Sequence, residues 1–260
     1  MWTYGGKGET AREKRPAPLV LDAGEFARVR LGVEPDPTQM ELLQSGAQRV
    51  MLNCSRQWGK STVAALMATH HAATRNDALV IVASASKRQS NELLEKIERY
   101  LKKIDMFVGG DGVNVPSAVL KNGSRIVGLP GRDDTSRGFA ATLLLIDEAA
   151  RVSDAMYKSL RPMVATTGGT IWLMSTPNGK QGFFYEEWEY GGDEWTRVSV
   201  AATECPRIRK EFLEEERGSL GPEWFRQEYM CEFVSRGTEA FDRELVEAMV
   251  DERVTPLGLV

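Results

Sequence analysis

The sequence has few of the residues that metal sites and disulfide-rich proteins need. It contains two adjacent histidines, His70 and His71, and three cysteines, Cys54, Cys205 and Cys231, without metal-ligand spacing. Adjacent residues of a helix point to different faces, so the two histidines are not expected to share a metal ion. An odd number of scattered cysteines predicts neither a zinc site nor a disulfide framework, and it indicates a reduced, cytosolic protein.

Long apolar runs and a basic net charge are also missing. The longest apolar runs, such as residues 141–146, have the length of a strand, whereas a membrane-spanning helix needs about 20 residues. The first fifteen residues are rich in charged side chains and lack an apolar signal segment. The formal net charge of −4 is unlike that of dedicated DNA-binding domains, so any DNA contact has to be a local basic patch. No membrane partner is expected.

The order of apolar and helical segments predicts an α/β fold. From Arg49 onward, short apolar runs alternate with helical patterns, which is typical of a mostly parallel sheet flanked by helices. Strands are expected at residues 49–53, 78–83, 125–129, 143–147, 170–175 and 195–200. Helices are expected from Thr38 and at residues 60–75, 89–103 and 155–162.

Three segments are predicted along the chain. Residues 1–35 are interpreted as an N-terminal arm, because the chain begins without periodicity. Residues 36–203 are predicted to form the catalytic core. Residues 204–260 are charge-dense and are interpreted as a small C-terminal helical lid followed by the start of a linker, with helices at residues 208–217, 222–231 and 243–251.

The most informative segment is a strand and a turn that lead into Gly59-Lys60-Ser61 at the start of a helix. Such a turn directs backbone N–H groups and a helix N-terminus at a phosphate. Lys60 is expected to reach the β- and γ-phosphates, and the Ser61 hydroxyl is expected to bind Mg²⁺. Cys54 stands where the common form of this motif has its first glycine, which makes the motif less specific by itself.

Two further apolar strands end in polar residues. The first ends in Asp147 and Glu148, which can hold Mg²⁺ through water and activate the attacking water as general base, respectively. The second ends in Ser175 and Thr176. Parallel strands present ligands at their carboxyl ends, so both hydroxyls are expected beside the γ-phosphate; an ordinary strand-to-loop turn is the alternative.

With these three motifs in place, residues 36–235 resemble the N-terminal ATPase domain of viral large terminases. In that family the phosphate loop often reads Ser-Arg-Gln-x-Gly-Lys-Ser/Thr without the first glycine, as residues 55–61 do. The resemblance implies a P-loop NTPase-type fold with ATP and Mg²⁺ as cofactors. The nucleotide-binding residues that it implies are Gln39, Ser55, Arg56, Gln57, Trp58, Gly59, Lys60, Ser61, Thr62, Ser175 and Thr176.

The resemblance also assigns roles that the residues alone do not. Gln39 resembles the glutamine that contacts adenine, although it could equally be solvent-exposed. Arg137, in an Arg-Gly before the acidic strand, resembles an arginine finger supplied by a neighbouring subunit, and Arg56 is the rival for that role. The catalytic residues implied are Lys60, Glu148 and Arg137. Ser175, Thr176 and the proline that follows resemble a motif that couples loss of the γ-phosphate to movement of the lid.

The implied activity is packaging of double-stranded DNA into a procapsid by a homo-oligomeric ring, in the cytoplasm of an infected host cell. A capsid portal and a small terminase subunit are the implied partners. Large terminases usually continue into a nuclease domain, and none is expected in these 260 residues. Candidate contacts to the DNA backbone, which a solvated helix face would also explain, are Lys87, Arg88, Arg99, Lys102 and Lys103.

Two other functions fit the same motifs. A superfamily-two helicase shares the phosphate loop, the Asp-Glu strand and a Ser/Thr strand, but it needs a second motor-like domain, for which residues 204–260 are too few. A protein that binds ATP without hydrolysing it would not need a catalytic carboxylate at Glu148.

Overall fold

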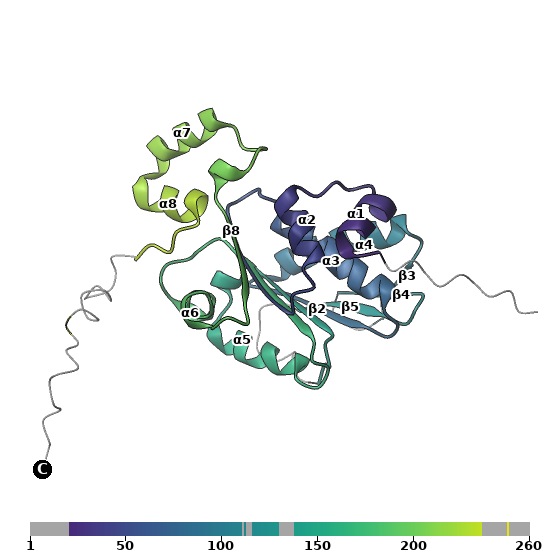
Figure 1. The fold of residues 1–260 in the computed structure, drawn as a ribbon. Helices are drawn as coiled ribbons and strands as arrows, with labels where there is room; N and C mark the ends of the chain where they lie inside the picture. The colour runs from purple at the N-terminus through teal and green to yellow at the C-terminus, as the bar shows by residue number, and fades with distance from the viewer. Residues whose placement is uncertain (1–20, 111, 113–115, 130–137, 236–248, 250–260) are drawn as a thin grey trace, which may run out of the picture.

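The structure is a computed structural model that describes residues 21–110, 112, 116–129, 138–235 and 249. Its centre is an eight-stranded sheet with the strand order β3-β4-β5-β2-β6-β7-β1-β8. The predicted α/β class, a mostly parallel sheet flanked by helices, is confirmed (Figure 1). The strands are β1 (Arg49–Cys54), β2 (Leu79–Ser84), β3 (Phe107–Gly109), β4 (Ser117–Leu120), β5 (Arg125–Leu129), β6 (Leu143–Asp147), β7 (Thr170–Ser175) and β8 (Thr196–Val200).

Six of these strands form a continuous parallel region. Strands β5, β2, β6, β7, β1 and β8 pair in parallel, and β6, β7 and β1 therefore end at the same edge of the sheet. At the end of the sheet next to β5, strand β3 pairs antiparallel with β4, and β4 pairs antiparallel with β5. The sequence did not predict β3 or β4. They are three and four residues long, too short for a pattern of alternating burial to be recognised.

Apolar side chains alternate between the two faces of the sheet. Val50 and Leu52 of β1 face one core, whereas Met51 faces the other. The first core is covered by α1 (Ala23–Leu31), α2 (Pro37–Gln44), α3 (Lys60–Thr74) and α4 (Lys87–Lys103). The second is covered by α5 (Asp154–Leu160), the short helix η3 (Arg161–Val164) and α6 (Gly182–Tyr190), on the opposite side of the sheet (Figure 1).

The predicted N-terminal arm is wrong for the residues that form α1. The Asp22 side chain accepts a hydrogen bond from the backbone N–H of Glu25 at 2.9 Å and caps this helix. Phe26 and Leu31 are buried in the first core, so α1 belongs to the folded domain. The apolar residues of this stretch are few and lie among charged ones, so the sequence pattern did not predict the helix. Tertiary packing stabilises it. Helix α6 was also not predicted.

A small helical unit follows β8. It consists of η4 (Ala202–Glu204), α7 (Lys210–Leu220) and α8 (Pro222–Met230), and it has a cluster of its own around Leu213, Phe225 and Tyr229. Helices α7 and α8 lie to one side of the layers that enclose the sheet (Figure 1). The expected helix at residues 243–251 lies outside the described residues. Among the described residues, no helix is long and apolar enough to span a membrane.

Candidate nucleotide-binding and hydrolysis site

The phosphate loop lies at the carboxyl end of β1 and leads directly into α3. Gly59 has φ of 106°, a conformation that favours glycine, and a Cβ atom there would come within 3.0 Å of Gln39 Nε2. Helix α3 begins after Gly59 without a side-chain cap. Its first N–H groups and the positive end of its dipole can therefore interact with an anion.

The two polar side chains that open α3 point in different directions. The Lys60 ammonium donates hydrogen bonds to the carbonyl oxygens of Cys54 at 2.6 Å and Ser55 at 3.0 Å. The Ser61 hydroxyl lies 3.4 Å from Asp147 Oδ2, at the end of β6. The structure thus brings together the phosphate loop and the acidic strand, which are 86 residues apart in sequence.

Asp147 and Glu148 differ in exposure. Asp147 is buried, and its pKa is raised to about 6, first by burial and then by the charge of Glu148. Glu148 follows with a left-handed backbone, φ 51° and ψ 42°, an uncommon conformation for a residue with a side chain. This turn carries its carboxylate away from β6 into a neighbouring cavity. Electrostatic repulsion between two adjacent carboxylates is typical of a site that binds a cation.

The donor atoms fit Mg²⁺. The Ser61 hydroxyl and the Asp147 carboxylate would supply hard oxygen ligands, and their oxygens lie 3.4 Å apart. Within the described ranges, no group of three or more His, Cys, Asp or Glu side chains could enclose a metal ion. Mg²⁺ commonly uses one or two protein ligands and completes its shell with water and phosphate oxygens, so a site of this kind suits it.

Two neighbouring cavities meet at these residues. One, of about 330 Å³, is lined by the phosphate loop from Arg56 to Thr62, with Trp58 excepted. The other, of about 340 Å³, lies between Asp147 and helix α4. Ser61, Glu148 and Lys96 line both of them. Lys96 was not predicted, because no local motif distinguishes it from the other charged residues of α4.

An ion-pair network surrounds the site and was also not predicted. Glu228 of α8 is 4% exposed and accepts hydrogen bonds from Arg56 Nε at 2.5 Å and Arg151 Nη2 at 3.1 Å. Arg151 Nη1 also donates to Glu148 at 2.9 Å and to Thr176 Oγ1 at 3.2 Å. The hydrogen bond to Glu228 is the main cause of a raised pKa at Arg56. One buried carboxylate therefore connects the phosphate loop, the acidic strand, the end of β7 and the helical unit.

Comparison with protein-family models identifies the chain. A model described as terminase large subunit, T4likevirus-type, N-terminal, matches residues 51–248. The chain belongs to the terminase large-subunit family.

Individual relatives agree with this assignment. The terminase large subunit of Escherichia phage T5 is 26% identical over 223 residues, which cover 81% of this chain and 50% of that protein. This terminase chain spans about half the length of the curated relatives that it matches. Its fold matches the large terminase ATPase domain of Thermus phage P74-26 with a TM-score of 0.69 and 24% identity, over 82% of this chain and all of that one. It also matches the large terminase of a thermophilic bacteriophage in complex with ATP-γ-S, with a TM-score of 0.64 and 13% identity, over 76% and 52% of the two chains.

Gln39, beside the phosphate loop, and Trp58, within it, have structural partners. Gln39 Oε1 accepts a hydrogen bond from the backbone of Asp36, and Gln39 Nε2 donates to the Trp58 carbonyl at 3.1 Å. The Trp58 side chain is buried in the first core, so only its backbone is available to a nucleotide. Arg207 also donates to the Trp58 carbonyl. Gln39 lies beside the loop, and its amide supports the loop in this structure.

The hydroxyl residues at the strand ends are buried. The Ser55 and Ser175 hydroxyls have no hydrogen-bond partner among the residues that the structure describes. Thr176 accepts a hydrogen bond from Arg151. Ser175 pairs in register with Asn53 of β1, so the end of β7 lies directly beside the strand that carries the phosphate loop. Arg137, the predicted arginine finger, lies outside the described residues.

The basic residues that the sequence suggests as contacts to the DNA backbone differ in the interactions that they make within the protein. Arg88 pairs with Glu92, and the Lys103 ammonium donates to the Leu31 carbonyl at 2.6 Å. Lys102 pairs with Glu98 and lies 4.7 Å from the centre of the Phe107 ring. Lys87 is exposed at the start of α4, and Arg99 lines the cavity beside Asp147.

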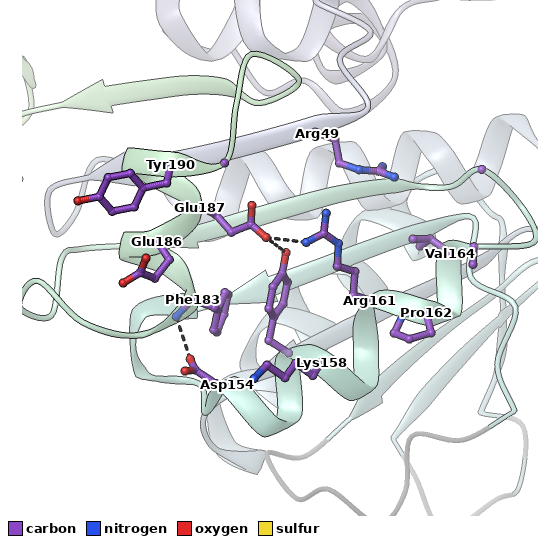
Figure 2. A pocket seen from close by; sticks show the side chains of 14 residues that line it. Arg49, Asp154, Lys158, Arg161, Pro162, Val164, Phe183, Glu186, Glu187 and Tyr190 are labelled. Atoms are coloured by element: carbon purple, nitrogen blue, oxygen red, sulfur yellow. Dashed lines mark hydrogen bonds and ion pairs between the residues drawn. The ribbon is translucent and has the colours of Figure 1, made fainter. Parts of the chain in front are cut away.

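A larger cavity of about 940 Å³ contains none of the predicted site residues. It lies between α5 and α6 and reaches Arg49, at the amino end of β1, whereas the phosphate loop follows the carboxyl end of that strand. In Figure 2, Arg161 points toward Glu187, and the Glu187 carboxylate accepts hydrogen bonds from the Tyr157 hydroxyl at 2.8 Å and from Arg161 Nη1 at 2.7 Å. Burial and the hydrogen bond to Glu187 raise the pKa of Tyr157. The polar groups of this cavity bind one another, which suits a structural role.

Proposed function

We propose that this chain is the Mg²⁺-dependent ATPase motor domain of a large terminase, which hydrolyses ATP to move double-stranded DNA into a procapsid. The observation that carries the proposal is the meeting of Lys60 and Ser61 with Asp147 and Glu148 around adjoining cavities. This arrangement has the parts that phosphoryl transfer needs: a phosphate cradle, metal ligands and a carboxylate beside them. The family match and the nucleotide-bound large terminase of a thermophilic bacteriophage support ATP as the ligand.

The residues act by position and charge. The N–H groups at the start of α3 and the Lys60 ammonium bind the phosphates, while Ser61 and Asp147 hold Mg²⁺. Bound Mg²⁺ supplies positive charge that stabilises the phosphates during transfer. Glu148 accepts a proton from the attacking water. Arg151 fixes the Glu148 carboxylate by a hydrogen bond of 2.9 Å and thereby orients it.

A second subunit would complete the site. In this proposal Arg137 reaches the neighbouring subunit's nucleotide in a homo-oligomeric ring around DNA, and Gln39 contacts adenine. Arg56, the rival finger, is held by Glu228 at 2.5 Å, which favours Arg137. Residues 36–203 would form the core and residues 204–260 the lid and linker. The capsid portal, the small terminase subunit and the cytoplasm of an infected host cell complete the proposal.

The test is Mg²⁺-dependent ATP turnover measured against protein concentration. The proteins are wild type, Glu148→Ala, Arg137→Ala and an equal mixture of the two variants. We expect turnover of the wild type to rise more steeply than linearly with concentration, because the site forms between subunits. Each variant alone should be inactive, and the mixture should regain activity, because each contributes an intact half of a shared site.

The outcomes separate the alternatives. Specific activity that is independent of concentration, with no recovery in the mixture, would place all catalytic groups in one chain and favour a helicase-like enzyme. Binding of ATP without turnover at any concentration, with or without added double-stranded DNA, would favour a nucleotide-binding protein that does not hydrolyse ATP.

A further inference from the structure

Lys96, in the middle of α4, lies at the centre of the candidate site although it belongs to none of the sequence motifs. Its ammonium donates a hydrogen bond to the Thr62 hydroxyl at 3.1 Å, at the beginning of α3. Together with Ser61 and Glu148, it lines both cavities of the site. Those two residues are the ones proposed to hold the metal ion and to activate water, so Lys96 lies where the end of a triphosphate would be.

In the part of the chain that the structure describes, the charge of Lys96 has no anionic partner in direct contact. Among the described residues, no carboxylate oxygen lies within 4.0 Å of its ammonium, although the side chain is partly buried. The acidic residue one turn before it, Glu92, pairs with Arg88 instead, at 3.1 Å. Burial and the nearby charge of Arg99 both lower the pKa of Lys96, against a smaller opposite effect of Asp147, so its surroundings disfavour the cation. A cation kept in such a place is stabilised when an anion binds beside it.

We propose that Lys96 is a second phosphate-binding lysine of this site, which contacts the terminal phosphate of the bound nucleoside triphosphate from helix α4. This inference rests on the proposed function, and it adds a residue to the phosphate loop and the acidic strand. Lys60 approaches from the loop, where its ammonium is bonded to two carbonyl oxygens. Lys96 approaches from the other wall, so the two lysines enclose the phosphate chain. An ammonium at that position also stabilises charge that spreads over the transferring phosphoryl group.

A purely structural role makes different predictions. In that case the hydrogen bond to Thr62 only holds α4 against α3, and its loss would lower the stability of the protein while changing the affinity for all nucleotides alike. A phosphate contact would instead change the preference for a triphosphate over a diphosphate. The ratio of the two dissociation constants therefore distinguishes the roles.

The experiment measures dissociation constants for Mg²⁺–ATP-γ-S and Mg²⁺–ADP by calorimetry, with Tm as the test of folding. The proteins are wild type, Lys96→Met, Lys96→Arg, Thr62→Val, Lys60→Met and the control Lys121→Met. Lys121 is an exposed lysine paired with Asp105 in the turn after β4, so its substitution removes the same charge far from the site. Lys60→Met shows what the loss of the phosphate-loop lysine does.

We expect Lys96→Met to weaken binding of ATP-γ-S about tenfold, as for the loss of one charge-assisted hydrogen bond, with a much smaller effect on ADP. Lys96→Arg should recover most of the loss, and Lys121→Met should resemble wild type. Equal losses for both nucleotides, or an ATP-γ-S affinity unchanged by Lys96→Met, would overturn the role of Lys96. If wild type binds neither nucleotide, the proposed function itself fails. If wild type binds both and only Lys60→Met loses binding, nucleotide binding at the phosphate loop stands and the inference about Lys96 fails.

Discussion

At the scale of single residues, Glu228 has more influence on the site than its place in the sequence indicates. Its buried carboxylate lies between the guanidinium groups of Arg56 and Arg151, and Arg151 in turn bonds to Glu148 and Thr176. A buried carboxylate is tolerated only when its charge is compensated, and the two arginines provide this. The arrangement gives the helical unit a direct contact with the residues of the candidate nucleotide site.

Glu228→Gln tests the strength of this contact. The substitution keeps the size of the side chain but removes the charge between two guanidinium groups. We expect the free energy of unfolding to fall by about 2 kcal/mol, less than for a fully enclosed pair because Arg56 is 60% exposed. Urea denaturation at neutral pH measures the change. Glu232→Gln is the matched control, because Glu232 is a more exposed partner of Arg226 and its loss should cost less than about 0.5 kcal/mol. Equal effects of the two substitutions would contradict the importance of Glu228.

The sequence predicts those site residues that lie in short contiguous motifs. Lys60 and Ser61 follow from the turn into α3, and Asp147 follows from the end of an apolar strand. Lys96 and Glu228 do not, because each reaches the site from the middle of a helix through packing between distant segments. Periodicity can place such residues on a face of a helix, but it cannot say which strand end that face meets.

At the scale of elements, the central strands were the easiest part to predict. The predicted limits of β5, β6 and β7 agree with the structure, because buried parallel strands are nearly continuous apolar runs bounded by polar residues. Helix α1 was not predicted because its apolar residues are buried only through contacts with α2 and α3, which are not evident from the sequence pattern. Propensity and pattern therefore predict the sheet well and the peripheral helices less well.

The packing of α3 on the sheet makes stability depend on pH through His71. This residue is buried, its Nε2 lies 2.9 Å from the Thr142 hydroxyl, and burial is the main reason why its pKa is lowered to about 3. The unfolded chain, with an ordinary pKa near 6.5, binds a proton as pH falls below that value, whereas the folded chain does not until about pH 3. The neutral imidazole thus contributes stability that is complete above pH 6.5 and is lost progressively toward pH 3.

His71→Gln should reduce this dependence. Between pH 7.5 and pH 5 we expect the wild type to lose about 2 kcal/mol of unfolding free energy through His71, and the variant to lose that much less. Urea denaturation at the two pH values gives the comparison. Burial also lowers the pKa of His70, so a double variant with His70→Gln should flatten the dependence further. Identical pH dependence of His71→Gln and wild type would show that His71 does not govern acid stability.

At the scale of the whole molecule, polar contacts join the helical unit to the strand ends, and Phe233, just after α8, packs on the aromatic residues of α6. Asn53 Nδ2 donates to the Cys231 carbonyl at 2.8 Å, the Gly179 N–H donates to Gln227 Oε1 at 3.1 Å, and Glu228 completes the set. The unit's own apolar cluster is small, and Ile208 connects it to the first core. A unit with few buried apolar residues of its own opens at a lower free energy than the domain as a whole.

Hydrogen exchange should therefore divide the chain near residue 203. We expect amides of α7 and α8 to exchange with a smaller free energy of opening than amides of β1, β6 and β7, whose cores cover both faces of the sheet. Saturating Mg²⁺–ATP-γ-S should slow exchange at the end of β6 and also in α8, because Arg151 and Glu228 transmit contact from the site to that helix. Glu228→Gln should retain the first effect and lose the second, which mass spectrometry of peptides from both regions can measure. Uniform protection of the strands and the helical unit would show a single cooperative unit. Slowing at β6 alone in the wild type would mean that the network does not couple the helical unit to the nucleotide.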